Sequence, residues 1–227
     1  METAGLQAVL WDLDGTILDS DPLWGRAEAE MLARYGIEYT DEIRDMLIGS
    51  GLWDAAERFR ELGVELSADE IVAEWVEHVG PAIGRGEAEW RPGARELIGS
   101  LRGAGIPCAL VTMSVRSLAD RVLALLPPGS FAVVIAGDEV AWPKPHPEPY
   151  LLAAAALGVS IERCVVIEDS PTGIHAGNAS GAVTIGVPNM VSLREAPAHA
   201  LWSTLEGRDA QLVRDEYSRL ALLHSEE

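Results

Sequence analysis

Lysine is almost absent from this sequence. The chain of 227 residues has a single lysine, Lys144, and the rest of its lysine-plus-arginine total of 17 is arginine. A lysine ammonium is a compact point charge on a flexible stem, whereas the arginine guanidinium is a wide planar fork. One hypothesis is therefore a crowded phosphate or carboxylate site around Lys144. The alternative is an ordinary surface lysine in an arginine-biased sequence.

Positive charge as a whole is also scarce. The formal net charge is −19 at pH 7, so the surface should repel phosphate backbones. Nucleic acid and anionic membrane are therefore poor partners. An anionic small substrate would need a locally positive site, which a bound cation together with Lys144 could supply.

Cysteines and long apolar runs are few. The two cysteines, Cys108 and Cys164, lie in short apolar runs and lack metal-ligand spacing, so we expect reduced core residues and no disulfide. No apolar run approaches the roughly 20 residues of a membrane span. The first residues carry neither a basic segment nor a signal-peptide core, and a cytoplasmic location is the expectation.

Hydrophobic residues make up 48% of the chain, enough for a substantial core. Short apolar runs without polar alternation predict strands buried on both faces of a parallel sheet. These runs cover residues 7–11, 107–111, 131–136, 163–167 and 182–187. Helical patterns separate them at 94–103, 115–126, 148–157 and 172–180, and a last one lies at 208–223. The alternation predicts an α/β fold, a doubly wound parallel sheet.

The interval between the first two predicted strands is too long for one crossover helix. It contains amphipathic patterns at 22–35, 52–62 and 68–79, which predict an inserted helical module. We therefore expect a core domain of residues 1–18 and 91–227, and a helical cap domain of residues 19–90.

The motif Asp12-Leu13-Asp14-Gly15-Thr16 directly follows the first apolar run. Two carboxylates on a turn that leaves a buried strand are costly unless a cation or hydrogen bonds compensate. The glycine allows a sharp turn and close approach to a ligand. The motif predicts a small site for a divalent cation and an anion.

Polar residues also follow the other apolar runs, and ligands of parallel α/β sheets collect beyond the carboxyl ends of the strands. We therefore expect convergence at one edge. Oxygen ligands in this number suit magnesium and not zinc. Ser170-Pro171 also predicts a helix cap whose positive end points to the same place. The converging residues are Asp12, Asp14, Thr112, Met113, Ser114, Lys144, Glu168, Asp169 and Ser170.

Each motif has an ordinary alternative. An EF-hand loop starting at Asp12 would need glycine and glutamate where Ile17 and Leu23 stand, so that type of calcium loop is excluded. Thr112 and Ser114 alone would suit a helix cap, and the Glu168-Asp169 pair alone a solvated loop. The four sets in this order favour a functional site.

With these motifs the chain resembles the haloacid dehalogenase (HAD) superfamily, in the subgroup with a helical cap inserted after the first strand. The resemblance covers residues from about 6 to 190. The stretch from Asp21-Pro22-Leu23-Trp24 to Glu28 is similar to bacterial sugar- and hexitol-phosphate phosphatases of this group. The most specific stretches are 12–20, 144–150 and 166–174.

The resemblance implies a magnesium-dependent phosphatase acting on a small phosphomonoester, most simply a sugar or sugar-alcohol phosphate. Asp12 would be the nucleophile and form an aspartyl-phosphate. Asp14 would be the general acid and then the general base. Lys144 would bridge the nucleophile and the transferring group.

The remaining site residues follow from the same resemblance. Mg²⁺ would bind the Asp12 carboxylate, the Asp14 backbone carbonyl and Asp169, with Glu168 direct or through water. Phosphate oxygens would contact the Thr112 hydroxyl and neighbouring groups, which are Leu13, Asp14, Met113 and Ser114. The expected partner is a small phosphorylated metabolite, and the chain would be a monomer or weak homodimer. Expected cap contacts are Trp24, Arg26 and Trp53.

Other branches of the superfamily fit less well. Asp14 argues against a dehalogenase, and the lack of a cap lysine excludes a Schiff-base phosphonatase. A β-phosphoglucomutase-like mutase shares all four motifs, but its cap histidine and arginine correspond here to Trp24 and the stretch 49–52, so hydrolysis is favoured. A non-catalytic binding protein would be expected to have lost one of the acidic or lysine motif residues. Met113 departs from the small or amide residue usual at its position.

Overall fold

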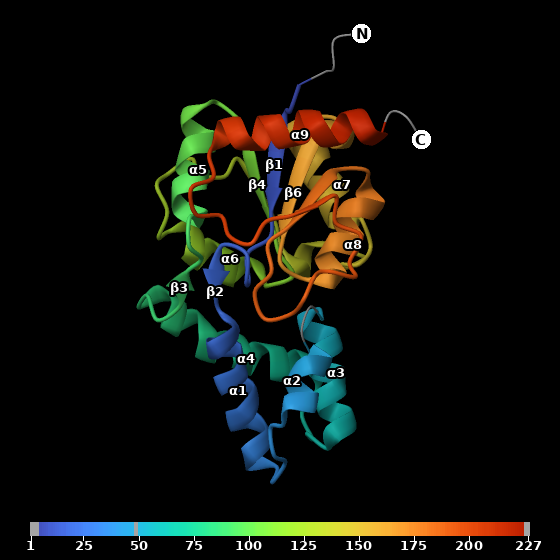
Figure 1. Ribbon diagram of the computed structural model, residues 1–227. Coiled ribbons are helices and arrows are strands. Elements are labelled where there is room, and N and C mark those ends of the chain that lie inside the picture. The colour runs from blue at the N-terminus through green and yellow to red at the C-terminus, as the bar shows by residue number, and fades with distance from the viewer. Residues whose placement is uncertain (1–4, 48–49, 225–227) are drawn as a thin grey trace.

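The structure is a computed structural model that describes residues 5–47 and 50–224. A sheet flanked by helices forms one part, and the helices within residues 21–84 lie together beyond one end of the sheet (Figure 1). The sheet is parallel and has the order β5-β4-β1-β6-β7-β8. Its strands are β1 (Ala8–Trp11), β4 (Cys108–Val111), β5 (Val133–Ile135), β6 (Cys164–Glu168), β7 (Val183–Gly186) and β8 (Ala200–Leu201).

Helices cover both faces of this sheet, which confirms the predicted doubly wound α/β class. Side chains of a strand alternate between faces, so Trp11 packs in one hydrophobic cluster and Leu10 in the other. The Trp11 cluster includes residues of α5 (Ala94–Gly103), α6 (Arg116–Leu123) and α9 (Ala210–His224). The Leu10 cluster includes residues of α7 (Glu148–Leu157) and α8 (Pro171–Ser180). Two short 3₁₀ turns, Gly137–Glu139 and Ile161–Arg163, lie in the connections.

The inserted segment forms four helices. They are α1 (Asp21–Arg34), α2 (Asp41–Leu47), α3 (Leu52–Leu62) and α4 (Ala68–Gly84). Helix α4 begins at a capping box of Ser67 and Glu70 and contacts α1, α3 and, in the sheet part, α6. Phe59 of α3 meets Trp75 of α4 edge to face, with ring centroids 4.8 Å apart. Within the described residues no helix combines the length and apolar character of a membrane span.

A short antiparallel ribbon joins the two parts. Strand β2 (Leu18–Asp19) pairs with β3 (Glu89–Trp90), and the Arg91 N–H donates to the Ile17 carbonyl at 2.9 Å. The chain therefore leaves and re-enters the sheet part through two adjacent strands. The ribbon lies where the sequence predicts the boundaries of the cap domain, between residues 18 and 19 and between residues 90 and 91. The division into these two domains stays a prediction.

Gly93 and Gly99, which lie just after the chain returns from the helical part to the sheet part, provide a matched test of backbone constraint. A Cβ on Gly93 would lie 2.2 Å from the Leu205 carbonyl carbon, and φ there is +84°, whereas a Cβ on Gly99 in α5 meets nothing within 4 Å. We expect Gly93→Ala to lower the free energy of unfolding by about 2–4 kcal/mol. Gly99→Ala should raise it by about 0.5–1 kcal/mol. Urea unfolding measures both, and equal effects would contradict the packing described.

Candidate active site

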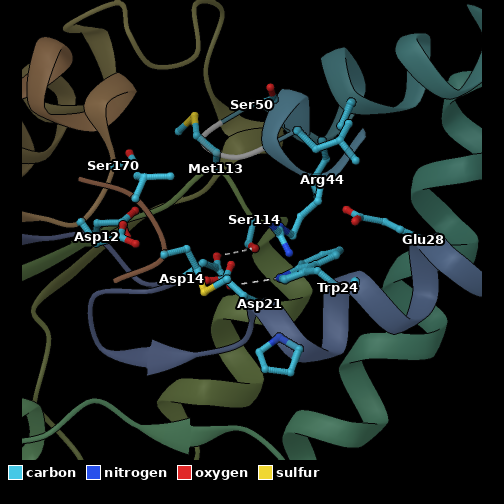
Figure 2. Close-up of a pocket in the computed structure, with 18 of the residues that line it drawn as sticks. Asp12, Asp14, Asp21, Trp24, Glu28, Arg44, Ser50, Met113, Ser114 and Ser170 are labelled. Carbon is cyan, nitrogen blue, oxygen red and sulfur yellow. Dashed lines mark hydrogen bonds between the residues drawn. The ribbon is translucent and has the colours of Figure 1, made fainter. Parts of the chain in front are cut away.

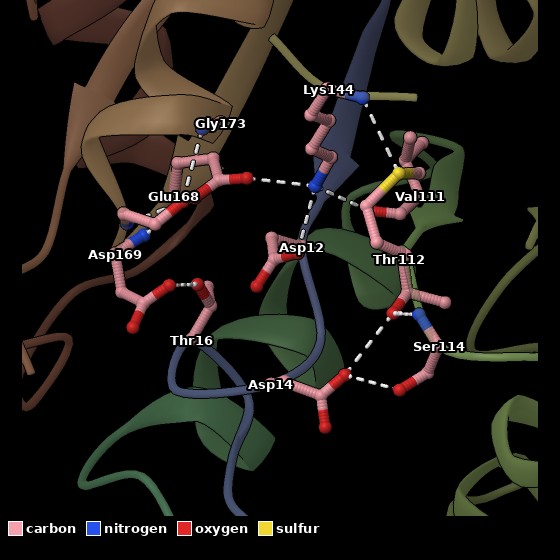
Figure 3. Close-up of polar contacts among 12 residues, drawn as sticks. Asp12, Asp14, Thr16, Val111, Thr112, Ser114, Lys144, Glu168, Asp169 and Gly173 are labelled. Atoms are coloured by element: carbon pink, nitrogen blue, oxygen red, sulfur yellow. Dashed lines mark hydrogen bonds and ion pairs between the residues drawn. The ribbon is translucent and has the colours of Figure 1, made fainter. Parts of the chain in front are cut away.

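The ammonium of Lys144 lies at the centre of the site, beyond the end of β1 (Figure 3). Its Nζ donates to Asp12 Oδ1 at 2.8 Å, to Glu168 Oε1 at 2.7 Å and to the Val111 carbonyl at 2.9 Å. The Lys144 side chain is only 3% exposed. Three strand ends and one loop therefore meet at one buried cation, as expected where neighbouring crossovers diverge in a parallel sheet.

Glu168 is held from all sides. Its Oε1 accepts from Lys144 and from the Tyr150 hydroxyl at 3.0 Å. Its Oε2 accepts from the backbone N–H groups of Asp169 and Ser170 and from the Ser170 hydroxyl, each at 3.0 Å. Both oxygens thus already have donors, so Glu168 fixes the ammonium and the turn into α8.

Helix α8 begins as predicted at Ser170, whose hydroxyl accepts from the Gly173 N–H at 3.0 Å, with Pro171 next in the chain. A Cβ on Gly173 would lie 1.6 Å from Glu168 Oε1, and one on Gly15 would lie 2.0 Å from Asp169 Oδ2. Gly15 also has φ of +81°. Both glycines let backbone approach the carboxylates more closely than any side chain would allow.

The site carries more negative than positive charge. Burial, followed by the charge of Glu168, raises the pKa of Asp12 to about 7, although Lys144 opposes this. Burial and then Asp12 raise the pKa of Asp169 well above its usual range. Burial alone would lower the pKa of Lys144, but Asp12 and Glu168 outweigh it and hold that pKa well above its usual value. A further cation at this place would therefore stabilise the ionised forms of these carboxyl groups.

The residues fit a divalent cation. Asp12, Glu168 and Asp169 each offer an oxygen, and these atoms lie within 4.8 Å of one another. Asp12 Oδ2 is buried and has no hydrogen-bond partner among the described residues. Asp169 receives one long hydrogen bond, from the Thr16 hydroxyl at 3.4 Å. Carboxylate oxygens are the ligands that hard divalent cations prefer, and those of Asp12 and Asp169 have the fewest hydrogen bonds.

Asp14 is held between the sheet part and the helical part. The hydroxyls of Ser114 and Thr112 donate to Oδ2 at 2.7 and 3.2 Å, from the turn after β4. The Ser20 hydroxyl and the Trp24 indole N–H donate to Oδ1 at 2.5 and 3.3 Å, from the start of α1. The Thr112 hydroxyl, which the sequence predicts at phosphate, thus contacts Asp14 in this structure. Trp24 of the helical part contacts the same carboxylate.

A cavity of about 340 Å³ opens above these groups and reaches the helical part. Leu13, on the predicted phosphate turn, is buried and is not part of the cavity lining. Met113 lines the cavity, and its sulfur accepts the Lys144 backbone N–H at 3.4 Å, so this side chain ties the lysine loop to the turn after β4. Trp24 also lines the cavity (Figure 2).

Two residues predicted as cap contacts, Arg26 and Trp53, do not line this cavity, and their contact with substrate stays a prediction. Arg26 is two residues after Trp24 on α1, hence on the opposite helix face, and pairs with Glu87 at the surface. The indole N–H of Trp53 donates to Asp69 at 2.8 Å, and Trp53 does not line the main cavity. For both residues, the direction in which the side chain leaves its helix explains why it does not line this cavity.

Other lining residues were missed by the sequence analysis. Among them are Asp21, Glu28, Tyr39 and Arg44 of the helical part and Met190 of the loop after β7. Burial, then the charge of Asp14, raises the pKa of Asp21 to about 6. The Asn189 amide donates to Asp21 at 2.9 Å and to Asp19 at 3.3 Å. For Glu28 a signal existed, because it follows Trp24 by four residues and so shares its helix face.

Comparison with known proteins identifies the family. Residues 6–181 match the family of haloacid dehalogenase-like hydrolases. The chain belongs to this family. The resemblance inferred from the motifs is thereby confirmed, and the chain is a HAD-like hydrolase.

Several relatives of this HAD-like hydrolase are similar over most of their length. Hexitol phosphatase B of Escherichia coli K12 is 30% identical over 192 residues, which cover 80% of this chain and 83% of that protein. Fructose-1-phosphate phosphatase YqaB of the same strain is 34% identical, with coverage of 79% and 95%. The crystal structure of CbbY from Rhodobacter sphaeroides in complex with phosphate has a TM-score of 0.81 at 30% identity, covering 89% of this chain and 96% of that one.

Cation binding should stabilise the fold in a pH-dependent way. Burial raises the pKa of Asp12 from its ordinary value of 3.8 to about 7 in the folded protein, so the free energy of unfolding of the cation-free protein should fall as pH rises between these two values. Mg²⁺ at about 100 times its Kd should add about 2.7 kcal/mol. The gain should be larger at about pH 8 than at about pH 5, where protons compete.

Thermal unfolding with Mg²⁺ or with chelator at both pH values measures this effect. Asp169→Asn should abolish most of the Mg²⁺-dependent shift. An equal shift in that variant, or no shift in the unaltered protein, would contradict the assignment of the cation site.

Proposed function

We propose that this HAD-like hydrolase is a magnesium-dependent phosphatase that hydrolyses a small phosphomonoester, most simply a sugar or sugar-alcohol phosphate, through an aspartyl-phosphate. The observation that carries the proposal is the buried contact of Lys144 with Asp12, whose second oxygen has no hydrogen-bond partner among the described residues. The names of the hexitol phosphatase and fructose-1-phosphate phosphatase relatives support the substrate class.

In the first step a carboxylate oxygen of Asp12 attacks phosphorus, and the bond from phosphorus to the ester oxygen breaks. Asp14 gives a proton to the leaving alcohol oxygen. Thr112 and Ser114, whose hydroxyls donate to Asp14 in this structure, would donate to phosphate oxygens once substrate is bound. The products are an alcohol and the acyl phosphate on Asp12.

In the second step Asp14 takes a proton from a water molecule, whose oxygen attacks the same phosphorus. The bond between phosphorus and Asp12 breaks, inorganic phosphate leaves and both carboxyl groups return to their starting state. Lys144 faces Asp12 in both steps and offsets the charge of the phosphoryl group.

Asp12, Asp169 and the backbone carbonyl of Asp14 would hold Mg²⁺, with Glu168 behind them fixing Lys144. Bound Mg²⁺ would neutralise phosphate charge so that an anionic carboxylate can approach it. The helical part would cover the cavity and exclude bulk water during the reaction.

A mutase remains the second candidate, because it would use the same groups of the sheet part. Of the stretch 49–52, residue 49 lies outside the described residues, and Ser50 and Leu52 line the cavity without offering a charge. Arg44 does line it, but its guanidinium is paired with Asp41 and Asp45. Hydrolysis is therefore the function that the geometry supports best.

Asp12→Asn tests the nucleophile. The amide should leave the fold intact and lower kcat by about four orders of magnitude or more, because no other nucleophile replaces the carboxylate. Release of inorganic phosphate from an aryl phosphate and from a panel of phosphorylated metabolites, with Mg²⁺ and with chelator, measures it. Asp120→Asn, which changes an exposed side chain of α6, is the control and should retain activity. Appreciable turnover by Asp12→Asn would refute the role of Asp12.

Lys144→Arg tests the point charge. The space around Nζ is filled by three acceptors, and a planar fork does not fit there. We expect kcat/KM to fall about 100-fold or more although the charge is kept. Arg121→Lys, a surface change on α6, serves as the reverse control. Near-normal kinetics of Lys144→Arg would mean that Lys144 has no special part in the reaction.

A further inference from the structure

The cavity wall opposite Asp12 comes from the helical part. Trp24, Glu28 and Arg44 lie on that side, whereas Asp12 and Ser170 lie on the other (Figure 2). A substrate whose phosphate meets Asp12 and Lys144 would therefore present the rest of its leaving group to this wall. Apolar side chains line part of the same wall, namely Leu47, Leu52 and Ala55.

Glu28 is the unusual member of the wall. It is only 9% exposed, and among the described residues the recorded donor to its carboxylate is the Tyr39 hydroxyl, at 2.6 Å. No ion pair of Glu28 is recorded within that part of the chain. Burial and the charge of Asp21 raise the pKa of Glu28, while Tyr39 opposes the rise. A buried carboxylate with one neutral partner gains from further hydrogen-bond donors, and this one faces the cavity.

The charges of the wall disfavour a second phosphate. Asp21 and Glu28 both line the cavity, and Arg44, the arginine that lines it among the described residues, is paired with two carboxylates of its own helix. Nη1 of Arg44 lies 2.9 Å from Asp41 Oδ1, and its Nη2 lies 3.1 Å from Asp45 Oδ1. A second phosphate here would meet more negative than positive charge and would compete with Asp41 and Asp45 for Arg44. A neutral group rich in hydroxyls would meet acceptors instead.

We propose that Glu28, oriented by Tyr39, accepts hydrogen bonds from hydroxyl groups of the leaving group and thereby selects monophosphates of polyhydroxylated alcohols over bisphosphates. The assignment rests on the proposed phosphatase function. It makes Glu28 a specificity residue, which acts on one class of leaving group and leaves the phosphoryl chemistry at Asp12 unchanged.

The test compares three substrates in the full chain with Mg²⁺: a hexitol 6-phosphate, the matching hexitol 1,6-bisphosphate, and an aryl phosphate that has no hydroxyl groups. Glu28→Gln keeps the shape but weakens the acceptor. It should lower kcat/KM for the hexitol monophosphate about tenfold and leave the value for the aryl phosphate within about twofold. Glu28→Leu should lower the first value further, and Tyr39→Phe should act in the same direction to a smaller extent.

Glu30→Gln is the matched control. Glu30 lies on the same helix, is exposed and pairs with His78 at the surface, so this variant should change neither value. The unaltered protein should also prefer the monophosphate to the bisphosphate by about tenfold or more, and Glu28→Gln should narrow that preference.

The outcomes separate the two proposals. If no substrate releases phosphate with Mg²⁺, the phosphatase function fails and the role of Glu28 falls with it. If the aryl phosphate is cleaved but the Glu28 variants change all substrates equally, or none, only the role of Glu28 is refuted. Efficient cleavage of the bisphosphate by the unaltered protein would also overturn it.

Discussion

One buried ammonium organises this protein. Lys144 contacts Asp12 at the end of β1, Glu168 at the end of β6 and the Val111 carbonyl at the end of β4. An ion of this kind tolerates burial only when its partners are close and well oriented. The register of the three central strands, the loop that carries Lys144 and the cap of α8 therefore all have to agree for this contact to form.

The same contact leaves an imbalance that serves the chemistry. One ammonium faces Asp12, Glu168 and Asp169, and burial keeps water from screening them. Both oxygens of Glu168 already accept hydrogen bonds, so the uncompensated negative charge lies on Asp12 and Asp169. Under the proposed function, a bound divalent cation would offset this excess negative charge before an anionic substrate enters.

The sheet and its edge could be predicted from the sequence because their signals are local. Apolar runs predicted β1, β4, β5, β6 and β7, and polar residues after them marked the edge. Strand β8 has two residues and α2 buries little beyond Leu47, so neither has a usable periodicity. The residues of the cavity wall were harder to predict from the sequence. Whether Arg26 or Glu28 faces the cavity depends on how α1 is rotated against the sheet part. Tyr39 and Arg44 depend on the packing of a connection and a short helix.

The composition that first marked Lys144 has a practical corollary. The chain has no other side-chain amine, and this one is 3% exposed and enclosed by carboxylates. Acylating reagents and reductive methylation would find no lysine to modify while the native state holds. Chemical modification of Lys144 would therefore measure how often the protein interior opens. Each modified molecule would be one in which Lys144 had been exposed to bulk solvent.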